Sequence, residues 1–132
     1  MSAIKAAREW LATSTVAHVA FAFVAMGGWA LFANRDHTLP QALLAGLVQG
    51  TISALLTLGL KKFLEWFNVK LSGAAALIVP PLITAASILA ILTTAHTVAG
   101  TPEIAATIAV PFTVSTSYAV IYNLGLWRRR RA

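Results

Sequence analysis

Uncharged polar side chains recur inside the apolar stretches of this sequence. Those expected near mid-membrane are Gln49, Thr84, Ser87, Thr113, Ser115, Thr116 and Ser117. His18 and Tyr118 are expected slightly closer to the cytoplasm. A hydroxyl can bond to its own helix backbone, but an amide or imidazole cannot be fully satisfied within one helix. His18 and Gln49 therefore indicate a polar interior, where His18 could bind a ligand, respond to protonation or hold two helices together.

A second group of chemically capable residues is expected in two outer turns and comprises Arg35, Asp36, His37, His96 and Glu103. Two imidazoles and two carboxylates could bind a hard or borderline metal ion or sense pH. No H-x-x-H or similar ligand spacing accompanies them, so the favoured interpretation is solvated turn residues, and we predict no metal site.

Residue sets that catalysis requires are missing. The chain has no Cys, which removes disulfides, thiolate metal sites and thiol nucleophiles. No Asp or Glu falls inside the apolar stretches, so a buried carboxylate pair is absent, as is the embedded carboxylate of a coupled cation antiporter. We expect neither an enzyme nor a cofactor.

The elements that must position these side chains are membrane helices. Of 132 residues, 58% are hydrophobic and 11% are charged, a composition that needs lipid as its solvent. A helix crosses a hydrocarbon core about 30 Å thick with about 20 apolar residues. Four stretches free of Asp, Glu, Lys and Arg are long enough: Trp10–Asn34, His37–Leu60, Leu71–Pro102 and Ile104–Trp127. We predict an all-α integral membrane protein forming a single four-transmembrane-helix bundle, with spans near 10–33, 39–62, 73–97 and 102–126.

Basic residues predict the orientation of this bundle. Every Lys and Arg except Arg35 lies before the first span, between the second and third, or after the fourth. Because basic residues near span ends stay in the cytoplasm, both termini are expected there, most simply in a bacterial inner membrane. The tryptophans Trp10, Trp29, Trp66 and Trp127 all fall at predicted span borders, where indole is favoured.

Helix ends and packing positions are also legible. Thr38 and Gln41 fit a capping box, and Thr101-Pro102-Glu103 resembles a second helix start. Gly46 and Gly50, with three residues between them, predict a close helix contact alongside Ser53, with Gly27 and Gly28 serving the same purpose. Pro80, Pro81 and Pro111 predict kinks in the third and fourth spans, since each proline leaves a carbonyl without its amide partner.

These features favour a protein that binds or translocates a small or lipid-linked molecule as a homo-oligomer. The candidate binding residues are His18, Gln49, Ser53, Thr84, Ser87, Thr113, Thr116, Ser117 and Tyr118. The terminal residues Arg128, Arg129, Arg130 and Arg131 are expected to contact anionic headgroups at the cytoplasmic face. A noncatalytic accessory or scaffold subunit of a larger membrane complex, or an anionic-lipid-binding protein, is the alternative, and a holin-like pore former is a third. The dispersed basic residues argue against a nucleic-acid partner.

Overall fold

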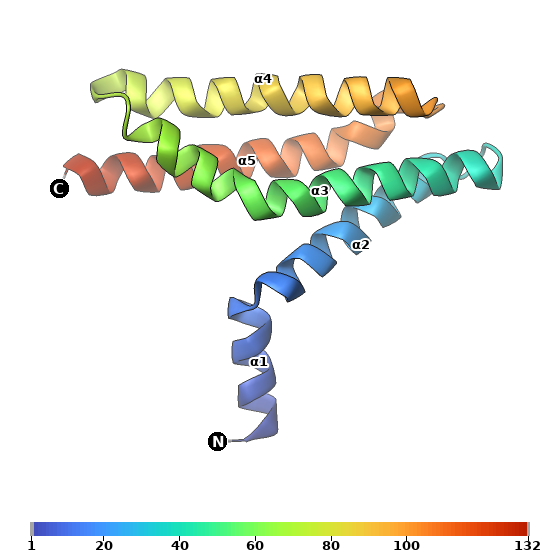
Figure 1. Cartoon of the computed structure of the whole chain (residues 1–132), viewed down its shortest axis with the longest axis horizontal. Helices are drawn as coiled ribbons and strands as arrows, with labels where there is room; N and C mark the ends of the chain where they lie inside the picture. The colour runs from blue at the N-terminus through green and yellow to red at the C-terminus, as the bar shows by residue number, and fades with distance from the viewer. Residues whose placement is uncertain (1, 132) are drawn as a thin grey trace.

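The computed structural model describes residues 2–131, apart from the side chain of Ala12, and within that range helices are the only regular secondary structure. They are α1 (Ala3–Thr13), α2 (Thr15–Ala33), α3 (Leu39–Asn68), α4 (Gly73–Ala99) and α5 (Ile104–Arg131) (Figure 1). Helices α2 to α5 are each long and apolar enough to cross a membrane. The prediction of an all-α chain with four apolar spans is confirmed, and a fifth, short helix is added to it.

Two ends of the bundle are distinct. The turns of residues 34–38 and 100–103 lie together at what we call the hairpin end, on the right in Figure 1. The opposite end carries Lys61, Lys62, Lys70 and the arginines that close α5, and we call it the basic end. Helix α3 packs against α2, α4 and α5, and α5 likewise packs against α2, α3 and α4.

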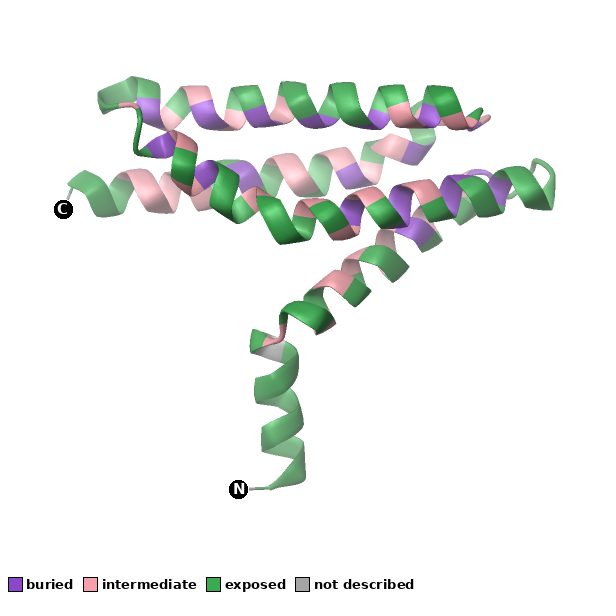
Figure 2. Cartoon of the chain, viewed as in Figure 1, coloured by how far each residue is buried: buried purple, intermediate pink, exposed green. Residues whose placement is uncertain are grey.

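Helix α2 joins the bundle with only part of its length. Its buried residues, Gly27 and Ala30, are near its C-terminus, and towards its N-terminus the helix diverges from its neighbours (Figure 2). A groove lies between the diverging half of α2 and the α3–α5 pair.

Helix α1 is separate from α2 because Ser14 interrupts the helical backbone. Ser14 is extended (φ −72°, ψ 121°), and its side-chain oxygen accepts a hydrogen bond from the Ala17 amide, so it caps the start of α2. The first span was expected to begin at Trp10, but the residues from Trp10 to Thr13 belong to α1.

Helix starts at the hairpin end agree with the sequence in one case and differ in the other. The predicted capping box is present, since Thr38 and Gln41 bond each other's backbone amides reciprocally. Helix α5 begins at Ile104 instead of at Pro102, and the buried Thr101 hydroxyl bonds to His96. The Thr101 side chain therefore bonds to α4 instead of capping α5.

Glycines allow α2 and α3 to touch backbone to backbone. A Cβ placed on Gly27 would lie 2.9 Å from the Gly46 carbonyl oxygen, and one on Gly50 would lie 3.0 Å from the Phe23 carbonyl oxygen. This close approach allows dispersion attraction between the two helices, which is needed because lipid provides no hydrophobic driving force for helices to associate. Gly28 does not share this role, because a Cβ there would meet nothing within 4 Å.

The α4 helix continues through Pro80 and Pro81, and the carbonyls they free are satisfied from other helices. Those carbonyls belong to Ala76 and Leu77, four residues before each proline. The Asn123 side-chain amide donates to both, at 3.0 Å and 2.9 Å, and the Asn68 amide donates to Ala76 at 2.9 Å. Two asparagines from α3 and α5 thus replace the missing intrahelical bonds.

Candidate functional site

A groove of about 710 Å³ lies between α2, α3 and α5. Its α2 residues precede Gly27 and its α3 residues follow Gly50, so the glycine contact closes it toward the hairpin end. Towards the basic end, α2 diverges and the groove widens to the surface, where Leu58, Val114 and Tyr118 are exposed. The groove therefore occupies the half of the bundle nearer the basic end.

The groove lining combines an apolar wall with a row of polar groups. The apolar residues are Ala22, Met26, Leu56, Leu58, Leu60, Pro111 and Val114, and the polar ones are Thr13, Thr15, His18, Ser53, Thr57, Lys61, Lys62, Ser115 and Tyr118. The histidine hydrogen bonds found within residues 2–131 belong to His37 and His96, so the His18 ring is unengaged in this range. Such a lining matches an amphipathic molecule better than a purely polar one.

Two lysines contribute positive charge to the basic end of the groove. Lys61 and Lys62 both line it, and the Lys61 ammonium is 6.0 Å from the centre of the Tyr122 ring. The ion pair found within residues 2–131 is His37–Glu103, so neither lysine has a carboxylate partner there. Glu65, one turn beyond Lys61, instead accepts a hydrogen bond from the Tyr122 hydroxyl. An anion in the groove would meet two ammonium groups that form no ion pair within residues 2–131, with the Glu65 carboxylate nearby at Tyr122.

Gln49 was predicted to face a binding site, but its side chain is buried, and both its nitrogen and its oxygen are hydrogen-bonded inside the bundle. Its amide nitrogen donates to the Ser53 hydroxyl at 2.9 Å, and its oxygen lies 2.8 Å from Nε2 of His96. Since an amide oxygen can only accept, Nε2 of His96 carries the proton and, in the neutral ring, Nδ1 accepts from the Thr101 hydroxyl at 2.7 Å. This chain of bonds joins α3 to α4 inside the bundle.

Only some of the other predicted binding residues reach the groove. His18, Ser53 and Tyr118 line it, whereas Ser87, Thr113 and Ser117 are exposed on the bundle surface. The Thr113 hydroxyl bonds to the carbonyl of Ala109 in its own helix. Within residues 2–131, the hydroxyl oxygens of Thr84 and Thr116 are buried without a hydrogen-bond partner.

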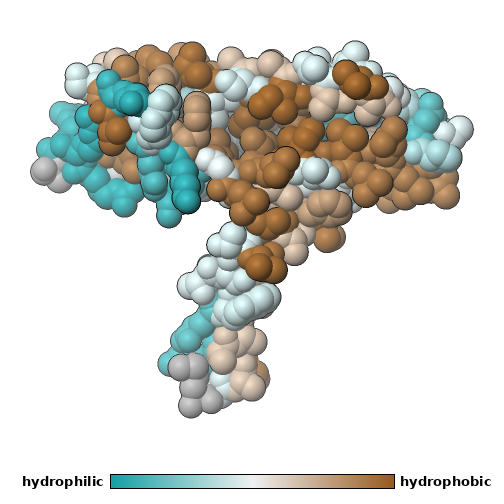
Figure 3. Space-filling view, in the orientation of Figure 1, coloured by the Kyte–Doolittle hydropathy of each residue, from teal (hydrophilic) through white to brown (hydrophobic). Residues whose placement is uncertain are grey.

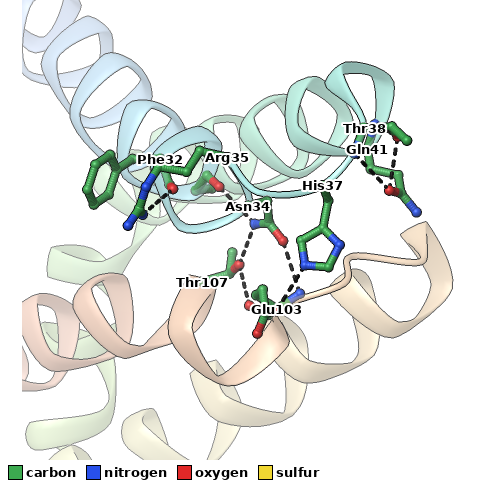
Figure 4. A network of polar contacts seen from close by, with 9 residues as sticks. Phe32, Asn34, Arg35, His37, Thr38, Gln41, Glu103 and Thr107 are labelled. Atoms are coloured by element: carbon green, nitrogen blue, oxygen red, sulfur yellow. Dashed lines mark hydrogen bonds and ion pairs between the residues drawn. The ribbon is translucent and has the colours of Figure 1, made fainter.

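At the hairpin end, the expected cluster is divided between surface and interior (Figure 4). The exposed side chains of His37 and Glu103 pair at 2.9 Å and so connect the two turns, while Arg35 lies over the Phe32 ring at 4.0 Å. His96 is absent from this cluster because its ring points into the bundle toward Gln49. Within residues 2–131, no three potential ligand side chains are close enough together to hold a metal ion.

Asn34 is the interior counterpart of this cluster. Its amide donates to the Ala30 carbonyl and the Thr107 hydroxyl, both at 2.8 Å, and its oxygen accepts from the Glu103 amide at 3.0 Å (Figure 4). The side chain therefore ties the end of α2 to the start of α5. It was not singled out in the sequence because it stood at a predicted span border.

The arginines at the basic end have unequal roles. Arg130 donates to the Asn68 carbonyl, the Asn68 side-chain oxygen and the Leu71 carbonyl, which fixes the α3–α4 connection to α5. Arg131 lies over the Trp127 ring at 4.4 Å. All four arginines are exposed.

Several residues that prove important were passed over in the sequence. Lys61 and Lys62 were considered only as signals of orientation, and Thr57 was not considered as a binding residue. Asn68 and Asn123 had an available signal, since the paired prolines require donors from outside their helix. The sequence did not indicate which helix would supply those donors.

The chain matches no protein-family model, no curated protein and no solved structure. Its function must therefore be argued from its own geometry.

Proposed function

We propose that the protein binds an anionic amphiphile, a lipid or lipid-linked molecule with a phosphate-bearing headgroup, in the groove between α2, α3 and α5. The observation that carries this proposal is the combination of an apolar wall with two lysines that have no carboxylate partner within residues 2–131. The groove volume, about 710 Å³, is in the range of about 300–1,000 Å³ that is typical of ligand sites.

The direction of the groove supports an amphiphile over a small polar solute. Its polar lining becomes more cationic from Ser53 and His18 toward Lys61 and Lys62 at the basic end. A hydrocarbon chain would lie along Met26, Leu56 and Val114, and its headgroup would approach the lysines. Because the groove opens sideways between α2 and α5, such a molecule could enter from the bilayer without crossing water.

The orientation inferred from the basic residues predicts which leaflet of the membrane would supply the bound molecule. With the basic end and both termini in the cytoplasm of a bacterium, the bound molecule would come from the inner leaflet of the inner membrane. Anionic lipids of that leaflet attract basic residues with about 1 kcal/mol each. The free lysines of the groove would add this attraction to the apolar contact.

Binding is favoured over translocation. The backbone contact between Gly27 and Gly46 closes the groove on its hairpin side, and beyond it Gln49 and His96 are buried and bonded to each other. A polar molecule would have to separate α2 from α3 to continue. The groove is formed by one chain, so the predicted homo-oligomer is not needed for binding.

Native mass spectrometry of the purified chain tests the proposal, with phosphatidylglycerol and phosphatidylcholine of equal chain length as probes. We expect preferential retention of phosphatidylglycerol. Lys61→Gln with Lys62→Gln should weaken its binding by about 30-fold, the ratio that corresponds to about 1 kcal/mol for each lysine. Lys70→Gln is the control, because Lys70 lies over the Trp66 ring at the same end but outside the groove.

A second pair of variants separates the groove from the general membrane surface. Ser115→Leu fills the groove, whereas Ser117→Leu changes an exposed position on the same helix. Only the first should reduce retention. Equal retention of both lipids by the wild type, or the same retention in all four variants, would refute the proposal. Co-purification of a stoichiometric protein partner would favour the accessory-subunit alternative.

A further inference from the structure

Helix α1 is amphipathic and unpaired. Its apolar side chains, among them Ile4, Ala7 and Leu11, recur at three- and four-residue spacing and so share one face, while Lys5 and Glu9 lie opposite. Figure 3 shows the same division, with hydrophilic residues on one side of α1 and apolar residues on the other. Among residues 2–131, no bundle helix other than α2 contacts α1, and the apolar side is left uncovered.

The exposure of α1 is large for a helix with an apolar face. Ile4 is 74% exposed, Trp10 is 55% exposed and Leu11 is 56% exposed. The helix touches α2 only near the Ser14 junction, and its described side chains lie outside the bundle core (Figure 2). A face this apolar needs a cover other than water.

The direction of α1 indicates what that cover is. In Figure 1, α1 runs across the direction shared by α4 and α5, so when those helices cross a membrane α1 lies parallel to its plane. Its hydrophilic side faces the basic end of the bundle and its apolar side faces the hairpin end (Figure 3). A helix embedded in the membrane surface has this arrangement, with its apolar side turned toward the hydrocarbon.

We infer that α1 is an interfacial helix that binds the anionic lipid surface on the basic-end side of the membrane. Ile4, Ala7, Trp10 and Leu11 insert among the acyl chains near the headgroups, and Trp10 occupies the level that indole prefers. Lys5 and Arg8 remain at headgroup level, where anionic lipid complements their charge. The helix then holds the start of α2, and the mouth of the groove beside Thr13 and Thr15, at that depth.

The absence of Cys from the chain permits a direct test. Single cysteines are introduced along α1 of the full-length protein, which is reconstituted at one copy per nanodisc containing phosphatidylglycerol. A membrane-impermeant maleimide should react at least about tenfold more slowly with cysteines at Ala3, Ala7 and Leu11 than with those at Lys5 and Glu9, since tenfold corresponds to about 1.4 kcal/mol. Bimane attached at the slow positions should be quenched by lipid that carries a nitroxide near its headgroup.

Each other environment for the apolar face of α1 predicts a different experimental result. Uniformly fast labelling would mean that α1 is in water and would overturn the inference. Slow labelling without quenching by nitroxide lipid would mean that α1 folds onto the protein, which also contradicts it. Protection that appears only when two copies share a nanodisc would assign the apolar face to a second copy instead. The result does not depend on what the groove binds.

Discussion

Replacing Asn123 tests whether side-chain amides compensate for the prolines of α4. Asn123 is fully buried and takes part in three hydrogen bonds, to the carbonyls of Ala76 and Leu77 and from the amide of Asn68. Hydrogen bonds between membrane helices contribute about 0.6 kcal/mol each on average. Asn123→Leu, which nearly preserves volume, should therefore lower the free energy of unfolding by about 2 kcal/mol.

The cause of this loss can be isolated by removing the prolines. In a background with Pro80→Ala and Pro81→Ala, residues 80 and 81 regain amides that can bond to the carbonyls of Ala76 and Leu77. Two of the three bonds are then dispensable, so Asn123→Leu should cost only about 0.6 kcal/mol. The double-mutant cycle should give a coupling energy of about 1 kcal/mol.

Unfolding of the reconstituted protein in mixed micelles of increasing SDS fraction, followed by tryptophan fluorescence, measures each corner of the cycle. Thr116→Val is the control, because the Thr116 hydroxyl has no hydrogen-bond partner within residues 2–131, and it should leave stability unchanged within about 0.5 kcal/mol. An equal effect of Asn123→Leu with and without the prolines would refute the compensation that we describe.

Three further predictions use the same unfolding measurement. Gly27→Ala should cost about 1–3 kcal/mol because its Cβ would lie 2.9 Å from the Gly46 carbonyl oxygen, while the adjacent Gly28→Ala should be neutral or slightly stabilising; equal effects would contradict the contact. His96→Leu should cost about 1–3 kcal/mol, since it leaves the buried Gln49 oxygen without its donor, and an unchanged midpoint would disprove the interior bond. Glu103→Gln should cost less than about 1 kcal/mol because the pair with His37 is exposed, and a larger loss would show that this pair holds the turns together.

The spans were predictable because length and hydropathy alone define them, and the Thr38 cap was predictable because its signature is local. The break at Ser14 also had a local signal, the run Thr13-Ser14-Thr15, each a good N-cap. That signal was outweighed by a charge-free stretch beginning at Trp10. Because no charged residue separates them, a hydropathy profile does not distinguish the end of a surface helix from the span that follows it.

The candidate site was harder to predict because depth along a helix says nothing of rotation about its axis. Ser115 and Ser117 are nearly level in the membrane, yet Ser115 lines the groove and Ser117 is exposed elsewhere. Gly27 and Gly28 differ in the same way. His96 was assigned to the outer turn because it stands at the end of the predicted span, whereas α4 continues to Ala99 and the His96 ring points inward to Gln49.

The link between Asn123 and the α4 prolines also constrains how this sequence can change over generations. Loss of the prolines first leaves a chain in which Asn123 has lost much of its purpose and can then vary. Loss of Asn123 first produces an intermediate in which the Leu77 carbonyl lacks its donor and the Ala76 carbonyl keeps only the Asn68 amide, a loss that selection would remove from a marginally stable protein. Among descendants of this chain, variation at residue 123 should therefore follow, and rarely precede, replacement of Pro80 and Pro81.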